Sequence, residues 1–342
     1  MGVDIAAWDK KGYTVENTDA ARLQASAQGV KAFKEAVSGL SVHWGLNTLL
    51  GRSEWCLHSD KMDPVAYFKT LMPKFHPTRF CAEEWADLLL EAGQKFFMIT
   101  TKHHDGFCMW DTALNDKKVT NTPFRRDVCA ELAKAMQERG IMVHWYHSLL
   151  DWTHPAYRRK ETWLEYLAYL NGQLRELLTA YGPIHGVLFD GYWPRHIFNE
   201  EDAYFEEQGP YQLAQIYDMI HTLQPDAMVT NNHHTPAIKG EDYQVWELDL
   251  PGENMTGFNS PAAASGVPRA SWQFLGGGWG YQPRNYVVRS AGEMMNKMRR
   301  TRALDGTTIL NVGPRPFGDI HPEEARVLRQ VGEQMRAEGL YP

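Results

Sequence analysis

Cysteine is scarce in this sequence. The 342 residues contain four cysteines, Cys56, Cys81, Cys108 and Cys129, and no two of them form a C-x-x-C pair. This number is too small for a disulfide framework in a chain of this length, and the spacing argues against a structural zinc site. Free thiols are typical of a reducing compartment, so we expect the protein to be cytoplasmic.

Targeting and membrane signals are also missing from the sequence. The first residues, MGVDIAAWDKKGYTVENTDAARLQ, contain no basic stretch followed by an apolar run, so we expect no signal peptide. No stretch approaches 18 uninterrupted apolar residues, so we expect no membrane span and no membrane partner. With 35 Lys and Arg against 42 Asp and Glu, the net charge is −7. This balance excludes a broadly basic surface for nucleic acid.

Aromatic residues and histidine are plentiful instead. The chain has 12 tryptophans, 15 tyrosines, 14 phenylalanines and 14 histidines. We expect most of the aromatic rings to pack in the core, where such rings bury large areas. A subset placed in a cleft would suit a ligand with flat apolar faces and many hydroxyl groups.

Apolar runs alternate with amphipathic segments along most of the chain. The runs predicted as strands cover residues 41–50, 95–101, 141–148, 183–193, 226–234, 241–250, 270–275 and 307–314. The segments predicted as helices cover residues 77–94, 125–140, 162–182, 211–225, 290–306 and 321–339. Eight strands separated mostly by helices predict a parallel sheet, and their number favours a single-domain (β/α)8 TIM-like barrel. We expect residues 1–39 to lead into a barrel formed by residues 40–342.

The predicted barrel is irregular, because the glycine-rich loops around the sixth and seventh strands lack a full helix. The alternative fold is a doubly wound sheet. No GxGxxG or GxxxxGK[ST] motif follows an early strand, which argues against that alternative and against a nucleotide cofactor. We therefore expect no cofactor.

Polar side chains follow the predicted strands one after another. They are His43; His103, His104 and Asp105; Tyr146 and His147; Asp190; Asn231, Asn232, His233 and His234; Asp242 and Glu247; Trp279 and Tyr281; and Asn311. A single residue of this kind is most often a capping or hydrogen-bonded structural residue. Because barrel enzymes place their chemistry at the carboxyl ends of the strands, the repetition on all eight strands predicts an active site there.

Metal and serine chemistry fit this pattern poorly. Histidine pairs suit zinc, but the first strand offers only His43 and no H-x-H pair. Adjacent residues of a strand point to opposite faces, so His103 and His104 cannot bind one ion unless the strand has already ended. No GxSxG motif marks a nucleophilic serine. We therefore predict no metal site, while keeping a metal-dependent hydrolase as an alternative.

Carboxylate chemistry fits better. Asp190 ends the apolar run GVLF and precedes GYW, and a carboxylate at the tip of a buried strand is costly unless it has a function. Its expected partner is Glu247, with Asp242, Asp249 and Glu253 as nearby competitors. Two carboxyl groups facing across a pocket can cleave a glycosidic bond, one acting at the anomeric carbon and the other transferring the proton.

Several motifs together resemble the α-L-fucosidases of glycoside hydrolase family 29. They are HWG at 43–45, EW at 54–55, KFFMITTKHHDGFCMWDT at 95–112, LFDGYW at 188–193, WGY at 279–281 and LNVGP at 310–314. The resemblance spans roughly residues 40 to 340. It implies an exo-acting, retaining, two-step mechanism on a barrel, with Asp190 as the nucleophile.

The resemblance also implies roles for other residues. The residues matched to binding of the fucose ring and its hydroxyls are His43, Glu54, Trp55, His103, His104 and Tyr146, with Trp193 of LFDGYW beside them. Trp279 matches an aromatic side chain near the methyl group of the sugar. Glu247 lies where some members carry the acid/base, with Asp242 as the second candidate and Glu253 as the third.

Two departures from the family pattern affect this assignment. Many members carry a W-E pair before the late WGY, and in several that glutamate is the acid/base, but this chain has Trp272–Gln273. Members also often carry an arginine after an Asn-Asp pair on the fifth strand, where this chain has Asn231–Asn232–His233. The glutamine leaves a non-catalytic fucose-binding barrel open as a further alternative.

The length suggests which form of the family this is. The sequence stops shortly after the last predicted helix, so we expect a short bacterial form without the C-terminal β-sandwich that many members add. The pocket would then be closed by barrel loops or by a neighbouring subunit, which leaves a homo-oligomer open. The implied substrate is a small fucosylated saccharide, and an α-1,6 linkage to N-acetylglucosamine is one candidate.

Overall fold

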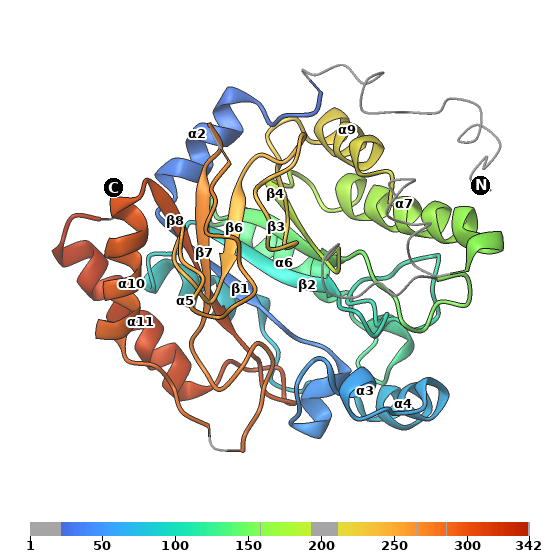
Figure 1. The fold of residues 1–342 in the computed structure, drawn as a ribbon. Coiled ribbons are helices and arrows are strands. Elements are labelled where there is room, and N and C mark those ends of the chain that lie inside the picture. Colours follow the sequence, from blue (N-terminus) through green and yellow to red (C-terminus); the bar gives the residue numbers. More distant parts are fainter. Residues whose placement is uncertain (1–21, 158, 193–210, 265, 285, 341–342) are drawn as a thin grey trace.

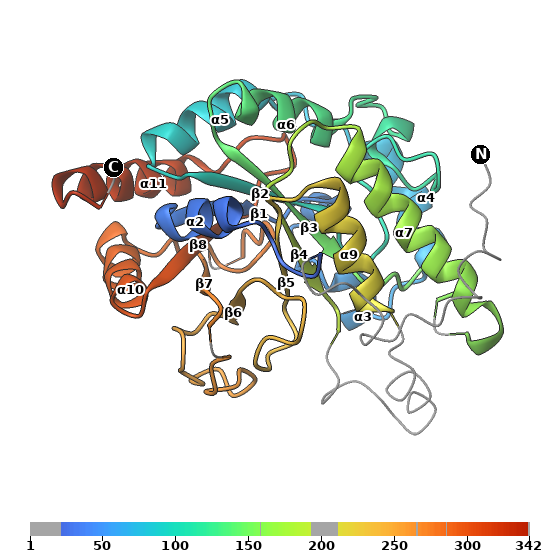
Figure 2. The same ribbon diagram turned by 90° about the horizontal axis from the view of Figure 1, so that it is seen from above.

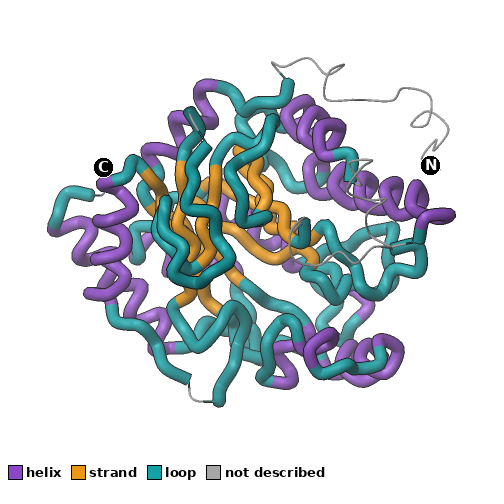
Figure 3. The backbone as a smooth tube through the Cα atoms, in the orientation of Figure 1, coloured by secondary structure: helices purple, strands orange, loops and turns teal. Residues whose placement is uncertain are grey.

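Eight parallel strands form the centre of the molecule. The computed structural model describes residues 22–192 and 211–340, apart from residues 158, 265 and 285. The strands are β1 Ser38–Val42, β2 Phe96–Lys102, β3 Met142–Ser148, β4 Gly186–Asp190, β5 Met228–Asn231, β6 Gln244–Glu247, β7 Arg269–Phe274 and β8 Gly306–Val312. Their order is β5-β4-β3-β2-β1-β8-β7-β6, and Figure 3 shows them grouped inside a shell of helices. The predicted (β/α)8 barrel is confirmed.

The barrel has one seam, between β5 and β6. Every other neighbouring pair of strands is joined by a parallel backbone ladder, whereas no ladder joins these two in the described part of the chain. Individual hydrogen bonds link them instead. Thr230 Oγ1 donates to the carbonyl of Tyr243 at 2.6 Å, the amide of Val229 donates to Asp242 Oδ2 at 2.7 Å, and the amide of Asp242 donates to the carbonyl of Val229 at 2.7 Å. The barrel is therefore nearly closed, with these contacts completing the seam.

Helices cover the outside of the barrel (Figures 1 and 2). They are α5 Ala82–Glu91, α6 Val128–Gln137, α7 Trp163–Thr179, α9 Leu213–Leu223, α10 Ala291–Ala303 and α11 Pro322–Ala337, with the short α3 Cys56–Ser59 and α4 Pro64–Leu71 between β1 and α5. All six predicted helices are present. Among the described residues, the segments 232–243 and 248–268 after β5 and β6 contain no helix, which accounts for the predicted irregularity.

Two details of the amino-terminal region differ from the prediction. A helix that the sequence analysis missed, α2 Ala27–Glu35, is capped by Ser26 Oγ and inserts the buried ring of Phe33 against Phe96 and Tyr243. The first strand begins at Ser38, so the expected boundary between residues 39 and 40 falls inside it. Residues 1–21 lie outside the described part of the chain.

The first strand is also shorter than the predicted run 41–50. It ends at Val42, and residues Leu46–Leu50 form a short 3-10 helix. The amide of Trp44 donates to Thr100 Oγ1 at 3.1 Å instead of to a neighbouring backbone, which ends the ladder. His43 therefore lies at the rim of the barrel.

The core has two parts, as expected for a barrel. One lies inside the strands and contains Phe96, Tyr146, Tyr243 and Trp272, and the larger one lies between strands and helices. All four cysteines are free thiols. No helix among the described residues is long and apolar enough to cross a bilayer. The cytoplasmic location and a homo-oligomeric state stay predictions.

Candidate active site

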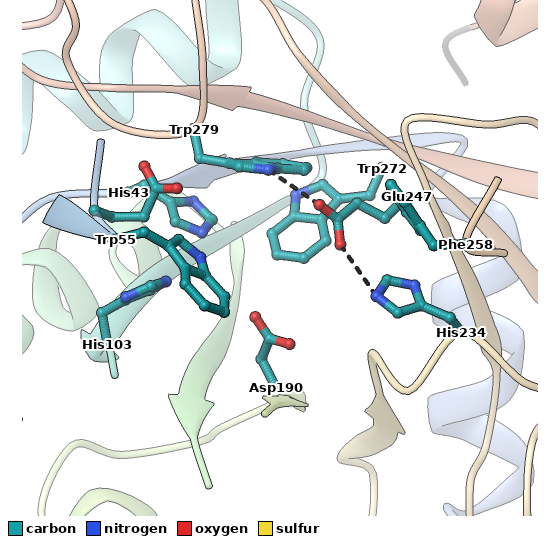
Figure 4. Close-up of a pocket in the computed structure, with 10 residues that line it drawn as sticks. His43, Trp55, His103, Asp190, His234, Glu247, Phe258, Trp272 and Trp279 are labelled. Atoms are coloured by element: carbon teal, nitrogen blue, oxygen red, sulfur yellow. Dashed lines mark hydrogen bonds and ion pairs between the residues drawn. The ribbon is translucent and has the colours of Figure 1, made fainter. Parts of the chain in front are cut away.

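A pocket of about 350 Å³ opens at the carboxyl ends of the strands (Figure 4). Its lining residues are His43, Glu54, Trp55, His103, Asp190, His234, Glu247, Phe258, Trp272 and Trp279. Seven of these ten residues are among the predicted site residues, and their positions along the chain span more than 230 residues. The size is in the range of small-molecule sites, roughly 300–1,000 Å³.

Asp190 occupies the floor of this pocket at the end of β4. Tyr146 Oη donates to its Oδ2 at 2.7 Å, and the amide of Gly191 donates to Oδ1 at 2.8 Å. Gly191 has φ +98°, and a Cβ there would lie 2.4 Å from Leu150 Cγ, so glycine is needed after the carboxylate. Burial raises the pKa of Asp190 to about 8, and the nearby charge of Glu247 adds to the rise.

Glu247 ends β6 and faces the same pocket. Trp279 Nε1 donates to its Oε1 at 3.1 Å, and Asn232 Nδ2 donates to its Oε2 at 2.7 Å. Burial raises the pKa of Glu247 to about 7 despite these two donors, with a smaller contribution from the charge of Glu54. Near neutral pH, this carboxyl group can therefore both donate and accept a proton.

Asn232 connects the two carboxyl groups. Its Nδ2 lies 2.7 Å from Glu247 Oε2 and 3.4 Å from Asp190 Oδ1. These two oxygens are therefore within about 6 Å of each other, whereas the carboxyl groups of inverting glycosidases are roughly 6.5–9.5 Å apart. At this separation the two groups titrate as a pair. Burial alone raises the pKa of Asp190 more than that of Glu247. Three groups donate hydrogen bonds to Asp190 and two to Glu247, and donors stabilise the ionised form, so the hydrogen-bond geometry favours the shared proton on Glu247.

The second acid/base candidate, Asp242, lies elsewhere, and we correct that assignment. It precedes the first residue of β6, Gln244, at the opposite end of the strand from Glu247. Its Oδ1 accepts from the amide of Ala25 at 2.7 Å, and its Oδ2 lies within 2.8 Å of both the amide of Val229 and His221 Nε2. These contacts occupy the carboxylate inside the fold, so it cannot reach a substrate in the pocket.

The other competing carboxylates are also engaged outside the pocket lining. Asp249 Oδ2 accepts from Thr256 Oγ1 at 2.6 Å and from Asn259 Nδ2 at 2.8 Å. Glu253 forms an ion pair with Arg300 of α10 at 2.6 Å. Glu247 is therefore the remaining acid/base candidate among the carboxylates named from the sequence.

Neutral histidines line the side of the pocket facing Glu54. His43 Nδ1 lies 2.7 Å from Asn311 Oδ1, and burial lowers the pKa of His43 to about 4. The pKa values of His103 and His104 are lowered well below the usual value, chiefly by burial. Neutral rings can each donate and accept a hydrogen bond, which suits hydroxyl groups.

Glu54 and the remaining predicted residues complete this side. The amide of Gly280 donates to Glu54 Oε2 at 3.1 Å, and burial raises the pKa of Glu54. The ring of Trp55 lies 5.1 Å from that of His104, edge to face. The ring of His103 stacks on Tyr146 at 5.6 Å. His104 and Tyr146 thus support the pocket from behind its lining, while Trp193 lies outside the described residues.

Gln273 does not face the pocket. Its Nε2 donates to the carbonyl of Asp249 at 3.1 Å and its Oε1 accepts from Lys297 Nζ of α10 at 2.5 Å, whereas the adjacent Trp272 lines the pocket. Alternation along β7 explains this difference, because neighbouring strand residues point to opposite faces. Having glutamine in place of the glutamate of many family members at this position therefore does not deprive the pocket of a carboxyl group.

Three lining residues were not among the predicted site residues, and neither was Asn232. Asn232 and His234 are polar residues at the end of a predicted strand, and this position is the signal that could identify them. Trp272 departs from the family pattern only through its neighbour Gln273, so the motif does not mark it as a lining residue. Phe258 lies in the loop after β6, where no periodicity or motif marks it.

Within the described part of the chain, one group of ligand atoms could hold a metal ion. His103, His104 and Asp190 each offer one such atom, and these atoms lie within 4.8 Å of one another. His104 Nδ1 lies 2.6 Å from Ser148 Oγ, which directs the ring, and His104 Nε2 lies 3.7 Å from Asp190 Oδ2. The residue types fit a transition metal, so metal-dependent hydrolysis stays the alternative chemistry for this pocket.

Comparisons with known proteins point to one family. The sequence pattern of the family described as Alpha-L-fucosidase matches residues 6–340. Tissue α-L-fucosidase of Rattus norvegicus is 27% identical over 339 residues, which cover 90% of this chain and 69% of that protein. The structure of α-L-fucosidase isoenzyme 1 from Paenibacillus thiaminolyticus matches with a TM-score of 0.79 and 29% identity, covering 94% of this chain and 78% of that chain.

A second solved structure bears on the mechanism. It is an α-L-fucosidase of Bacteroides thetaiotaomicron, trapped as a covalent intermediate in complex with 2-fluoro-fucosyl fluoride by means of a glutamate-to-glutamine mutant. It matches with a TM-score of 0.79 and 27% identity, covering 93% of this chain and 77% of that chain. Because the family pattern covers nearly the whole sequence and both structures share the barrel, this chain belongs to the α-L-fucosidase family of glycoside hydrolases.

Proposed function

We propose that this protein is an exo-acting, retaining α-L-fucosidase in which Asp190 is the nucleophile and Glu247 is the acid/base. The observation that supports this most strongly is the shared contact with Asn232, which keeps the two carboxyl groups on opposite sides of one pocket and close together. A covalent route needs a carboxylate within bonding reach of the sugar and a second group that holds a proton. The two residues at the ends of β4 and β6 meet both requirements.

The reaction proceeds in two steps. First, an oxygen of Asp190 forms a bond to the anomeric carbon while the bond from that carbon to the leaving oxygen breaks and Glu247 gives its proton to that oxygen. Then Glu247, now ionised, takes a proton from water, whose oxygen attacks the same carbon and releases Asp190. The two inversions give net retention. Tyr146 donates a hydrogen bond to Asp190 Oδ2. This bond can stabilise the negative charge of the carboxylate before the first step and again when the carboxylate is released in the second step.

The rest of the pocket binds the fucose ring. His43, which is buried, and His103, which is half-buried, lie on the side opposite Glu247 (Figure 4). The buried Glu54 lines the same pocket, and these three residues can hydrogen-bond the ring hydroxyls. Trp55 and Trp279 supply flat surfaces for the apolar face and the methyl group. The substrate is a small fucosylated saccharide, and we retain α-1,6-linked fucosyl-N-acetylglucosamine as the candidate to test first.

The experiment that tests the proposal is covalent labelling with 2-fluoro-fucosyl fluoride, whose fluorine slows the second step. Intact-mass and peptide-mass spectrometry should show one fucosyl adduct on the peptide that contains Asp190. Asp190→Ala should not be labelled, and Asp242→Asn, a control change at another buried aspartate, should be labelled normally. A label on another residue, or hydrolysis without a label, would contradict the assignment.

Metal-dependent hydrolysis is tested separately because of the His103–His104–Asp190 group. Prolonged incubation with a strong chelator should leave turnover of an aryl α-L-fucoside within twofold of the untreated enzyme. Loss of turnover that a divalent metal restores would favour the alternative. The non-catalytic alternative loses its original support, because Gln273 lies outside the pocket; binding of fucose without turnover of any fucoside would restore it.

A further inference from the structure

We propose that Lys102 and Asp151 are positioning residues. Their buried ion pair fastens the histidine turn after β2, residues 103–106, to the aspartate turn after β3, residues 149–153, and so holds both histidines in place for the fucose ring. This inference rests on the proposed function, because the ligand must be fucose. Neither residue of the pair is among the described residues that line the pocket, so any effect on binding is transmitted through these turns.

A β-bulge near the end of β2 turns Lys102 away from the inside of the barrel. Phe96 and Met98 belong to the core inside the strands, so regular alternation would point Lys102 inward as well. The register of β2 against β3 shifts just before Lys102, and a bulge re-aims the side chains that follow it. Lys102 Nζ accordingly lies 5.1 Å from the ring centre of Tyr169 in α7, while the next residue, His103, lines the pocket.

The ammonium group of Lys102 is buried, and Asp151 supplies its counter-charge. The two side chains are 0% and 1% exposed, and Lys102 Nζ lies 3.8 Å from Asp151 Oδ2. The rings of Tyr166 and Tyr169 add a weaker attraction for the cation. Apolar residues of similar size often stabilise a fold as well as a buried ion pair does, so this pair points to a role in fixing one arrangement of its neighbours.

Asp151 organises the aspartate turn. Its Oδ1 accepts from the amide of Thr153 at 3.0 Å, and its Oδ2 accepts from Tyr169 Oη at 3.1 Å. Gly106 of the histidine turn packs directly against this carboxylate, because a Cβ there would lie 2.4 Å from Asp151 Oδ1. The ion pair therefore joins the end of β2 to a carboxylate that already shapes one turn and contacts the other.

Further hydrogen bonds connect the two turns. The amide of Trp152 donates to the carbonyl of His104 at 2.9 Å. Thr153 Oγ1 lies 3.0 Å from Asp151 Oδ1 and 3.2 Å from the carbonyl oxygen of Asp105, so its hydroxyl bridges the turns. A displacement of Asp151 therefore displaces the backbone of the histidine turn as well.

The aspartate turn also sets the tautomer of His104. Ser148 Oγ donates to the carbonyl of Leu150 at 2.9 Å, so it is the acceptor for His104 Nδ1, 2.6 Å away. The proton of the neutral ring is then on Nδ1, and Nε2 is the atom of the ring that can accept a hydrogen bond from a sugar hydroxyl. Because Leu150 belongs to the aspartate turn, this arrangement depends on the position of that turn.

The test measures binding of free fucose by isothermal titration calorimetry, because binding depends on the placed histidines and involves no chemical step. Lys102→Met keeps the length of the side chain and removes its charge, and Asp151→Asn removes the charge of the partner. Each should weaken fucose binding about tenfold, the order expected for the loss of well-placed hydrogen bonds. Asp242→Asn, which removes another buried carboxylate charge, is the matched control and should bind fucose within about twofold of wild type while losing stability.

The double variant Lys102→Met/Asp151→Asn shows whether the two residues act as one pair. Independent changes would multiply to about a hundredfold loss of affinity, whereas removing both charges of one pair should cost no more than about tenfold. On an aryl α-L-fucoside, the loss should appear mainly in KM. A purely structural pair would show the same coupling in the free energy of unfolding but none in fucose binding.

Thr153→Val tests the bridge between the turns without changing a buried charge. Valine keeps the shape and removes the hydroxyl between Asp151 and Asp105, so fucose binding should weaken about threefold. Thr307→Val, at a buried hydroxyl near the start of β8 that donates to the carbonyl of Phe33, is the control and should leave fucose binding within about twofold of wild type.

The outcomes separate this inference from the proposed function. Wild-type protein that neither binds fucose nor hydrolyses any fucoside would refute the proposed function itself. Normal fucose affinity in folded Lys102→Met and Asp151→Asn would overturn the positioning role alone, and so would a hundredfold loss in the double variant. If these variants do not fold, unchanged affinity in Thr153→Val would overturn it.

Discussion

Two carboxylates at the two ends of β6 have opposite surroundings. Asp242 lies just before the amino end of the strand. Its carboxylate has three nitrogen partners within 2.8 Å, which are the amide of Ala25 before α2, the amide of Val229 in β5 and Nε2 of His221 in α9. Glu247 is at the carboxyl end, and its partners are two side chains, Asn232 and Trp279, beside a pocket. The same strand therefore carries one carboxylate that holds the fold together and one that is placed for chemistry.

The difference shows that burial does not by itself mark a catalytic acid. The side chain of Asp242 is 2% exposed and that of Glu247 is 18% exposed, but of these two only Glu247 lines the pocket and has a second carboxyl group, Asp190, across it. Changing each carboxylate should therefore affect a different property: turnover for Glu247 and folding stability for Asp242. The following experiments test that contrast, from the largest expected effect to the smallest.

Glu247→Gln should give the largest effect, on turnover. The amide cannot donate a proton to the leaving oxygen, so kcat/KM on a fucosyl disaccharide should fall about 10³-fold, within the range for loss of general acid catalysis. Fucosyl fluoride, which needs no protonation, should be affected far less. The free energy of unfolding, measured by urea titration, should change by less than about 1 kcal/mol. Equal losses on both substrates would contradict the acid role.

Asp242→Ala should show the reverse pattern. The change leaves the amides of Ala25 and Val229 and the ring of His221 without their acceptor, so the free energy of unfolding should fall by about 3 kcal/mol. Activity per folded molecule should stay within threefold. Asp242→Asn, which keeps one acceptor oxygen, should cost less stability than the alanine variant. A large loss of kcat in a folded variant would return Asp242 to the catalytic candidates.

The pH profile tests the coupling between the two pocket carboxyls. Activity is lost at low pH as Asp190 takes up a proton and at high pH as Glu247 loses one, so wild-type kcat/KM should be bell-shaped with both limbs near neutral pH. On fucosyl fluoride, Glu247→Gln should lack the alkaline limb, because glutamine has no proton to lose. Its acid limb should stay within about half a pH unit of the wild-type limb, because Glu247 is already protonated and uncharged where Asp190 takes up its proton. An alkaline limb that persists in the variant would contradict Glu247 as the group that titrates there.

Thr230→Val should give the smallest effect, at the seam itself. The substitution removes the hydroxyl that donates to the carbonyl of Tyr243 but keeps the shape of the side chain, so the free energy of unfolding should fall by about 1 kcal/mol. Thr307→Val, at a buried hydroxyl that donates to the carbonyl of Phe33 at 3.2 Å, is the matched control from outside the seam. The seam variant alone should also show faster amide exchange in β5 and β6, measured by mass spectrometry. Equal exchange in both variants would show that the seam has no special mobility.

The barrel could be predicted because a strand-like apolar run recurs eight times along the sequence. The pocket could be predicted because barrel enzymes place their functional residues at the carboxyl ends of the strands.

The choice of Asp242 as second acid/base candidate was wrong for a geometric reason. Five residues of extended chain span about 16 Å, so Asp242 and Glu247 cannot reach one pocket from the same strand. The helix α2 was missed because its sequence, AQGVKAFKE, has few apolar residues and relies on Phe33 to fill the end of the barrel.

Other parts of the site depend on contacts that no local pattern encodes. Asn232 bridges two carboxyls because β4, β5 and β6 come together at one rim, and Phe258 reaches the pocket because Asn259 anchors its loop. These placements follow from tertiary packing. A left-handed backbone at Gly191, directly after Asp190, could be anticipated because glycine adopts it readily. The left-handed backbone of His234 could not be anticipated from the sequence.

The missing ladder between β5 and β6 has a mechanical consequence. Asp190 and Asn232 belong to the β4–β5 side of this joint, and Glu247 and Trp279 to the β6–β7 side. The spacing between Asp190 and Glu247 is therefore set by Asn232, which contacts both carboxyl groups, together with the hydrogen bond from the amide of Asp242 to the carbonyl of Val229. The distance across the pocket thus depends on a few identifiable contacts and not on a continuous backbone ladder.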